Sequence, residues 1–230
     1  MKIIFSLILS LLLAACAGGQ TAPDWQYDTQ TAIQRYTRHY LAGEVKLAGA
    51  SFARARAAVA ATGDVAAVGH IELVRCGLHA AALDFTPCSG YSELAGIQTT
   101  PADRAYARFI GGDWQGMEAK LLPAQYAALV GASSQSQAEI NRVIGAIGDP
   151  VSRLIASGLM VKRGTFDAAT LRGAVDTAAA QGWRRPLLTY LNLQATQGGD
   201  AATLAAIRAR IRLVEQSMQT AAKPAPAATE

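Results

Sequence analysis

The sequence predicts an all-α protein of antiparallel helical hairpins, arranged either as a right-handed solenoid-like array or as a compact helical bundle. Apolar residues recur every three to four positions along most of the chain, which is the spacing of one face of a helix. Gly, Pro and capping residues divide these stretches into segments of helical length. No stretch alternates with a period of two for long enough to require a strand. The 230 residues are 51% hydrophobic and only 7% aromatic, and alanine is abundant, which suits closely packed helices.

Three helices are predicted in the first part of the chain, over residues 29–42, 44–61 and 65–83. Gly63 suits a left-handed helix end, and Asp64 can cap the helix that follows it. Each segment carries one apolar stripe. In order, the stripes are Ile33, Tyr36 and Tyr40; Val45, Ala48, Phe52, Ala55 and Val59; and Ala67, Ile71, Val74, Leu78 and Ala82.

Helix signals are shorter in the middle of the chain. A loop is expected over 84–90 and a short helix over 91–97. The next helix begins with Thr100 as cap, Pro101 at the first position and Asp103 reaching back to the cap. It ends at the Gly111-Gly112 pair. Pro123 opens or kinks another helix, and a polar loop is expected over 131–137.

Helices in the last third start near residues 149, 167, 184 and 200, after an expected helix over 138–147. Taken in pairs, these starts give a repeat of about 34 residues, and the Ala/Gly-rich hairpins over 149–215 resemble tetratricopeptide-like arrays. A closed bundle with short loops would give helices of similar length, so both architectures stay open. The last helix has a regular stripe: Leu204, Ile207, Ile211, Val214 and Met218.

The first sixteen residues have the features of a secretory signal. Lys2 precedes an apolar run, which ends in Leu13-Ala14-Ala15-Cys16. This ending resembles the lipobox of bacterial lipoproteins, in which the cysteine is lipidated. The resemblance implies a signal peptide over 1–15, a lipidated linker over 16–23, one α-helical periplasmic domain over 24–220 and a disordered tail over 221–230. Because Ala17 rather than Asp follows Cys16, the expected location is the periplasmic face of the outer membrane.

Charge is unevenly distributed along the chain. Without Lys2, 20 Lys and Arg oppose 17 Asp and Glu, too small an excess to argue for nucleic acid. Residues 140–215 nevertheless carry ten basic and five acidic residues. Three of those acids, Asp149, Asp167 and Asp200, stand where helices should start and should be engaged by N-terminal amides. The second half thus predicts a basic surface, which is either simply solvated or faces an anionic partner.

Two cysteines remain once Cys16 is assigned to the lipid. In an oxidising compartment, Cys76 and Cys88 predict a disulfide that pins the 84–90 loop back along the preceding helix. Such a bridge would contribute about 2 to 3 kcal/mol to stability. The alternative is a pair of reduced, buried thiols.

Few residues indicate catalysis. His70-Ile71-Glu72 and Pro87-Cys88 partly match the zinc deaminase pattern, but Tyr91 stands where the last thiolate ligand is needed. One helix face carries a carboxylate and an imidazole, which could act together as a general acid and base. The alternative is that these side chains form ion pairs on a solvent-exposed face and have no catalytic function. That face carries Glu72, Arg75, Cys76 and His79, while His39 reads as a surface or packing residue.

The preferred functional hypothesis is a non-enzymatic adaptor or scaffold for an envelope protein complex, without cofactor or metal. A groove lined by side chains such as Tyr36, Tyr40, Arg172 or Arg184 would favour it. The alternative is a closed bundle that binds a small hydrophobic or anionic ligand in one enclosed cavity. An enzyme using Glu72 and His79 is the third hypothesis, and it requires both side chains in one cleft.

Overall fold

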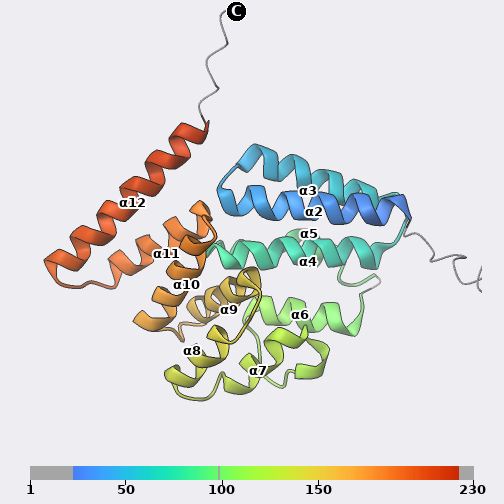
Figure 1. Cartoon of the computed structure of the whole chain (residues 1–230). Coiled ribbons are helices and arrows are strands. Elements are labelled where there is room, and N and C mark those ends of the chain that lie inside the picture. The colour runs from blue at the N-terminus through green and yellow to red at the C-terminus, as the bar shows by residue number, and fades with distance from the viewer. Residues whose placement is uncertain (1–22, 98, 223–230) are drawn as a thin grey trace, which may run out of the picture.

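A computed structural model describes residues 23–97 and 99–222, with side chains to residue 219, and this part of the chain is all-helical, without strands (Figure 1). The all-α prediction is confirmed. Cys16 and the predicted signal, the linker up to residue 22 and the tail from residue 223 lie outside the described residues. The helices are α2 (Asp24–Ala42), α3 (Val45–Ala60), α4 (Val65–Ala81), α5 (Ser89–Ser92), α6 (Pro101–Gly111), η2 (Ala119–Leu121), α7 (Ala124–Ala132), α8 (Gln137–Gly145), α9 (Pro150–Lys162), α10 (Ala168–Ala180), α11 (Arg184–Thr196) and α12 (Ala201–Ala222).

The helix starts follow the predicted capping residues. The side chains of Asp64, Thr100, Asp149 and Asp167 each accept a hydrogen bond from the backbone amide three residues later. Asp200 does the same with the amide of Thr203, 2.7 Å away. Three of the acidic side chains in the basic half of the chain are therefore engaged at helix N-termini, as expected.

Two helices depart clearly from the prediction, while elsewhere, as at the ends of α4 and α8, the boundaries differ by two residues. The first helix begins at Asp24 instead of residue 29, because the indole of Trp25 packs on the core between α2, α3 and α4. The short helix expected over 91–97 is instead α5, a single turn over Ser89–Ser92, anchored by the buried ring of Tyr91. The following turns leave Ile97 64% exposed, so they contribute no buried apolar face that would extend a helix.

The α2–α3 hairpin forms a layer over α4, as Figure 1 shows. The predicted stripes meet in this layer: Tyr36, Tyr40 and Phe52 pack together with Leu78 of α4. A second cluster, nearer the start of α2, joins Ala55 and Val59 to Ile71. Val45 is the exception within its stripe, since it is 67% exposed at the first turn of α3.

Helix α9 lies at the centre of the largest core cluster. Its residues from Leu154 to Met160 are all buried, and α4, α7, α8 and α10 pack around it. Gly158 allows the closest approach, because a Cβ there would overlap the carbonyl oxygen of Ala80 on α4. Burial on all sides is a bundle feature, whereas α10, α11 and α12 continue as successive antiparallel neighbours.

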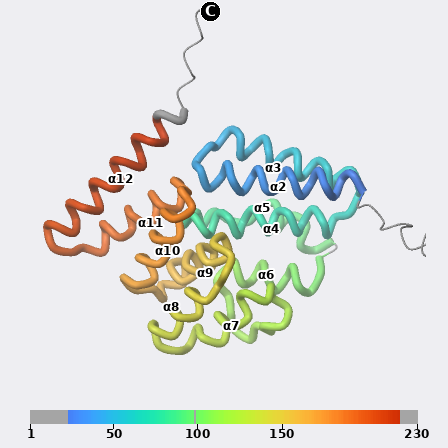
Figure 2. The backbone as a smooth tube through the Cα atoms, viewed as in Figure 1, coloured from blue at the N-terminus to red at the C-terminus, as the bar shows by residue number. Residues whose placement is uncertain are grey.

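The last helices return to the first. The smooth trace of Figure 2 shows the end of α12 approaching the turn between α2 and α3. There, the methyl group of Met218 lies where a Cβ of Gly43 would otherwise be. Between them, Arg184 donates to the carbonyl oxygens of Ala42 and Ser217, at 3.1 and 3.3 Å. None of the described helices is both long enough and apolar enough to cross a membrane.

Candidate functional site

Cys76 and Cys88 lie at disulfide distance, with their Cα atoms 5.8 Å apart. Cys76 is in α4 and Cys88 immediately precedes α5, so the bond holds the 84–88 loop against α4, as the sequence predicted. The loop and α5 then cover one side of α4, including the carboxylate of Glu72.

Glu72 is buried, which contradicts the expectation of a solvent-exposed ion-paired face. Its carboxylate contacts Arg56 of α3 at 3.0 Å and Arg75 of α4 at 2.7 Å. A Cβ at Gly90 would overlap this carboxylate, so the backbone of α5 closes the site from above. The Arg75 guanidinium in turn lies over the ring of Phe52, 4.8 Å from its centroid. Glu72 therefore joins three helices rather than facing a substrate.

His79 has a separate environment. Its Nδ1 lies 3.2 Å from a carboxylate oxygen of Asp84, and its ring stacks on Tyr40 with 4.8 Å between centroids. Burial lowers the pKa of His79; Asp84 opposes this shift, while Arg75 and Arg185 reinforce it. The acid/base pair suggested by the sequence is not assembled as such, because Glu72 and His79 each have other partners.

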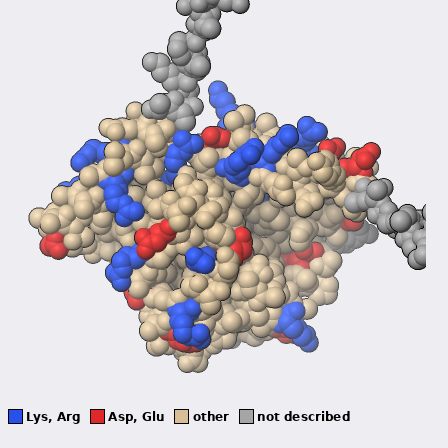
Figure 3. Space-filling view, in the orientation of Figure 1, with Lys and Arg blue, Asp and Glu red and all other residues tan. Residues whose placement is uncertain are grey.

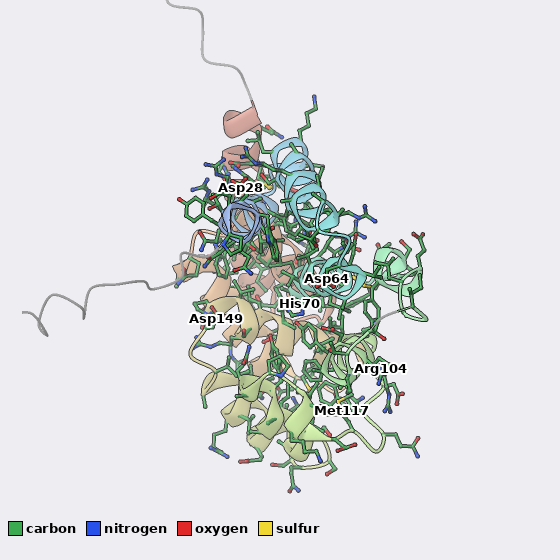
Figure 4. All side chains as sticks on the ribbon, turned by 90° about the vertical axis from the view of Figure 1, so that its right-hand side faces the viewer. Asp28, Asp64, His70, Arg104, Met117 and Asp149 are labelled. Carbon is green, nitrogen blue, oxygen red and sulfur yellow. A yellow bond between two sulfur atoms is a disulfide. The ribbon has the colours of Figure 1, made fainter. Side chains whose placement is uncertain are left out.

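The remaining histidines pair with single carboxylates. His70 contacts Asp103 at 3.1 Å, and Thr100 donates to the other oxygen of that carboxylate at 2.7 Å. Burial raises the pKa of Asp103, but the hydrogen bonds from Thr100 and His70 outweigh it and hold the pKa below its usual range. Figure 4 shows His70 between the upper layer, which carries Asp28, and the lower layer, which carries Met117.

Metal-ligand geometry is absent from residues 23–97 and 99–222, where no three His, Cys, Asp or Glu side chains could hold an ion together. The partial zinc deaminase pattern is therefore not a metal site in the described structure, since Cys88 lies at disulfide distance from Cys76. His39 contacts Glu44 at 2.5 Å, next to the α2–α3 turn, in a structural position.

Two of the four groove residues suggested by the sequence are buried instead. Tyr36 and Tyr40 are 3% and 6% exposed, packed within the α2–α4 layer. Arg184 contacts the end of α2, and its guanidinium lies 3.3 Å from Glu44. Of the four residues, only Arg172 both lines a groove and lacks a carboxylate partner among the described residues.

That groove, called here the C-terminal groove, lies between α10, α11 and α12 and has a volume of about 410 Å³. Its floor is apolar, formed by Leu171, Val175 and Ile207, and its sides carry two arginines, Arg172 and Arg210, and one acid, Asp176. The other lining residues are uncharged. The full set is Ala168, Leu171, Arg172, Val175, Asp176, Gln194, Gln197, Gly198, Thr203, Ile207 and Arg210.

Helix α12 forms one wall of the C-terminal groove and is the least embedded long helix. Of its described side chains, 201–219, none is buried, and the predicted stripe is only half-buried against α11. Arg208, Arg210 and Arg212 are exposed on it, and none forms an ion pair with a described residue. Figure 3 shows Lys and Arg atoms gathered on this face of the molecule, over α12 and α2.

Three exposed arginines of the second half therefore lie on α12, and Figure 3 shows basic atoms over α2 as well. A hydrophobic groove with arginines on its sides can accept an apolar surface that carries carboxylates. No protein-family model, no curated protein and no solved structure matches the chain. Function is therefore inferred from the sequence and the geometry of the chain.

Proposed function

We propose that the chain is an outer-membrane-anchored periplasmic lipoprotein whose helical domain is a non-enzymatic adaptor for an envelope protein complex. The lipobox-like ending at Cys16 supports the anchor, and residues 16–23 would serve as its linker. The observation that carries the adaptor role is the C-terminal groove, an open apolar surface bordered by arginines without acidic partners.

The occupant that suits this groove is an amphipathic helix of a partner protein with acidic residues beside its apolar face. Ile207, which is half-buried, offers apolar contact of the kind used in helix-in-groove recognition, above Leu171 and Val175, which are each 1% exposed. Arg172 on α10 and Arg210 on α12 approach from two sides, so carboxylates flanking the apolar face would meet both. Asp176 is the one acid in the lining, so the groove keeps a net positive charge.

The positions of the candidate catalytic residues support a non-enzymatic function. Glu72 contacts two arginines beneath Gly90, and His79 is stacked on Tyr40. Neither arrangement leaves a paired acid and base facing a common substrate.

Site-specific photo-crosslinking tests the adaptor proposal directly. A photoreactive residue at Gln197, in the groove, is expected to capture one envelope protein in cells, while the same residue at Gln34, exposed on α2, captures none of it. The crosslinked peptide of the partner should combine an apolar helical face with Asp or Glu. Equal capture from both positions, or a captured peptide without carboxylates, would contradict the proposal.

Charge reversal supplies the matched control. Arg172→Glu with Arg210→Glu should reduce the Gln197 crosslink by about tenfold, because two attractive charges become repulsive. Arg35→Glu with Arg38→Glu makes the same change in net charge at exposed, unpaired arginines of α2, and it should leave the crosslink intact. A similar loss in both variants would show only a general dependence on protein charge.

The anchor is tested separately through Cys16→Ser. Membrane fractionation should find this variant released, or retained as an unprocessed precursor. Processed protein that stays in the outer-membrane fraction would refute a lipid anchor at Cys16 without affecting the groove.

A further inference from the structure

A second groove lies on another side of the molecule, beneath the disulfide-held loop. It is bordered by α4, the 84–88 loop, α5 and α6, and it has a volume of about 460 Å³, within the range of small-molecule sites. We call it the loop groove. It shares no lining residue with the C-terminal groove, so nothing argued here depends on the adaptor proposal.

The interior of the loop groove is apolar. Leu73 and Ala80 of α4, Tyr91 of α5 and Ile110 of α6 form its depth, and all four are buried. The Cys76–Cys88 pair adds two sulfur atoms to the same wall. Phe85 is also in the lining, and it is 37% exposed. An apolar ligand seated in the groove would cover part of this ring.

The mouth of the loop groove is positively charged. Lys162 reaches it from α9: its Nζ donates to the carbonyl oxygen of Ile110 at 3.0 Å and lies 5.8 Å from the centroid of the Phe85 ring. No carboxylate within the described part of the chain pairs with this ammonium. Burial lowers the pKa of Lys162, with no opposing contribution from an acid. A nearby anion would favour the charged form.

The other charged groups of the mouth have partners already. Arg108 donates to Asp113 and to the carbonyl oxygen of Gln115. Asp84, the only acid in the lining, accepts from the amide and hydroxyl of Thr86 and contacts His79. Lys162 is therefore the cation of the groove that is left for a ligand.

We propose that the loop groove binds a long-chain aliphatic anion, with the chain in the apolar interior and the acidic head at Lys162. An uncharged apolar molecule would leave this ammonium uncompensated, and a cation would be repelled by Lys162. Such an anion can be a free fatty carboxylate or an acidic lipid still in a bilayer, and the two share the same chemistry of recognition.

Calorimetric titration of the mature chain, residues 16–230 with Cys16→Ser, tests the site without competing anchor lipid. Dodecanoate is expected to bind with one-to-one stoichiometry, and affinity should rise by about fourfold for each methylene added between octanoate and dodecanoate. Dodecyltrimethylammonium has a chain of the same length with the opposite charge, and it should bind at least about tenfold more weakly. Equal binding of the two, or none of dodecanoate, overturns the proposal.

Two variants locate the binding. Lys162→Met keeps the length of the side chain and should weaken dodecanoate by about tenfold, whereas Lys120→Met, at a lysine paired with Glu118 outside the groove, should not. Ser92→Trp should block the groove from an exposed position on α5. Thermal unfolding without ligand shows that each variant is folded. Undiminished binding by folded Lys162→Met and Ser92→Trp overturns the assignment to this groove.

Vesicle flotation then distinguishes the two sources of the anion. Flotation with phosphatidylglycerol vesicles but not phosphatidylcholine vesicles, lost in Lys162→Met, would support the site and assign it to bilayer lipid. Binding of dodecanoate without flotation would support the site for a free carboxylate. Flotation that Lys162→Met leaves unchanged would place the lipid contact elsewhere and overturn the bilayer assignment.

Discussion

Gly158 brings the backbones of α9 and α4 into direct contact at the centre of the core. Gly158→Ala should lower the free energy of unfolding by about 1–3 kcal/mol, because the new Cβ would overlap the backbone oxygen of Ala80, which cannot move without its helix. Gly49→Ala is the control, since Gly49 lies in α3 with no atom within 4 Å of the new Cβ. It should raise stability by about 0.5–1 kcal/mol through helix propensity alone.

Urea unfolding followed by helical circular dichroism measures both substitutions. Opposite signs for the two glycines would establish the close approach of α9 to α4. A neutral or stabilising Gly158→Ala would mean that the two helices are farther apart than described.

His79 makes stability depend on pH in a mildly acidic range. Its pKa is lowered in the folded state, chiefly by burial, from an ordinary value of 6.5. The unfolded chain therefore takes up a proton at a higher pH than the folded chain does, so unfolding becomes more favourable as the pH falls below about 6.5. The stability contributed by neutral His79 is complete above that pH and is lost progressively below it, down to the folded-state pKa.

Thermal midpoints measured between pH 7.5 and 5 test this dependence. The decrease on acidification should be smaller in His79→Gln, whose side chain does not titrate. Above pH 7.5 the slopes of the two proteins should coincide, because the imidazole is neutral in both states. An equally steep decrease in His79→Gln would assign the acid sensitivity to other groups.

Among the elements, the 84–88 loop and α5 depend most on the covalent link to α4. Cys76→Ser with Cys88→Ser should lower the unfolding free energy by about 2–3 kcal/mol, because the closed loop of 12 residues would regain its freedom in the unfolded chain. Dithiothreitol should reproduce this loss in the unsubstituted protein and add nothing in the double variant. If dithiothreitol also destabilised the double variant, its effect would not come from reduction of the Cys76–Cys88 bond.

Local rules explain which elements were predictable. The caps Asp64, Thr100 and Asp149 act on amides three residues away, so their function is visible in any short window of sequence. The all-α class and the Cys76–Cys88 pairing were likewise predictable from spacing and composition. The burial of Glu72 was not predictable in this way, because Gly90, which covers its carboxylate, and Arg56, which pairs with it, belong to two other elements.

The same distinction applies to the candidate sites. Arg172 was recognised as a groove residue, but Tyr36 and Tyr40 were misjudged because a stripe of aromatic residues looks the same whether it faces a groove or another helix. The loop groove was missed altogether. Its cation, Lys162, and its apolar wall on α4 are far apart in the chain, so no sequence pattern could connect them.

At the scale of the whole molecule, Arg184 and Arg185 connect the end of the described chain to its beginning. Arg185 donates to the carbonyl oxygen of Tyr40 at 2.8 Å and lies over the Tyr40 ring, while Arg184 donates to Ala42. These are carbonyls of the last turn of α2, and that of Tyr40 also accepts from the amide of Gly43 at 3.1 Å. Both arginines thus cap α2 across more than 140 residues of chain.

Replacing both arginines should loosen the first hairpin selectively. In Arg184→Ala with Arg185→Ala, hydrogen exchange is expected to speed up in α2 and α3 while α9 stays protected, because the central core is unchanged. Arg208→Ala with Arg212→Ala removes two exposed, unpaired arginines of α12 and should leave α2 unaffected. Uniform acceleration throughout the chain in the first variant would instead show that the connection stabilises the molecule as a single unit.

The contact between α11 and α2 also determines how the molecule would carry mechanical load. A chain held at its N-terminus and pulled by a partner seated against α12 would transmit tension from α2 through Arg184 and Arg185 to α11 and then α12. The elements from α3 to α10 would lie outside this direct route. Force would therefore act first on the two guanidinium contacts together with the packing of Trp183 on the Tyr40 cluster and of Met218 on Gly43, before it stretched the central core around α9.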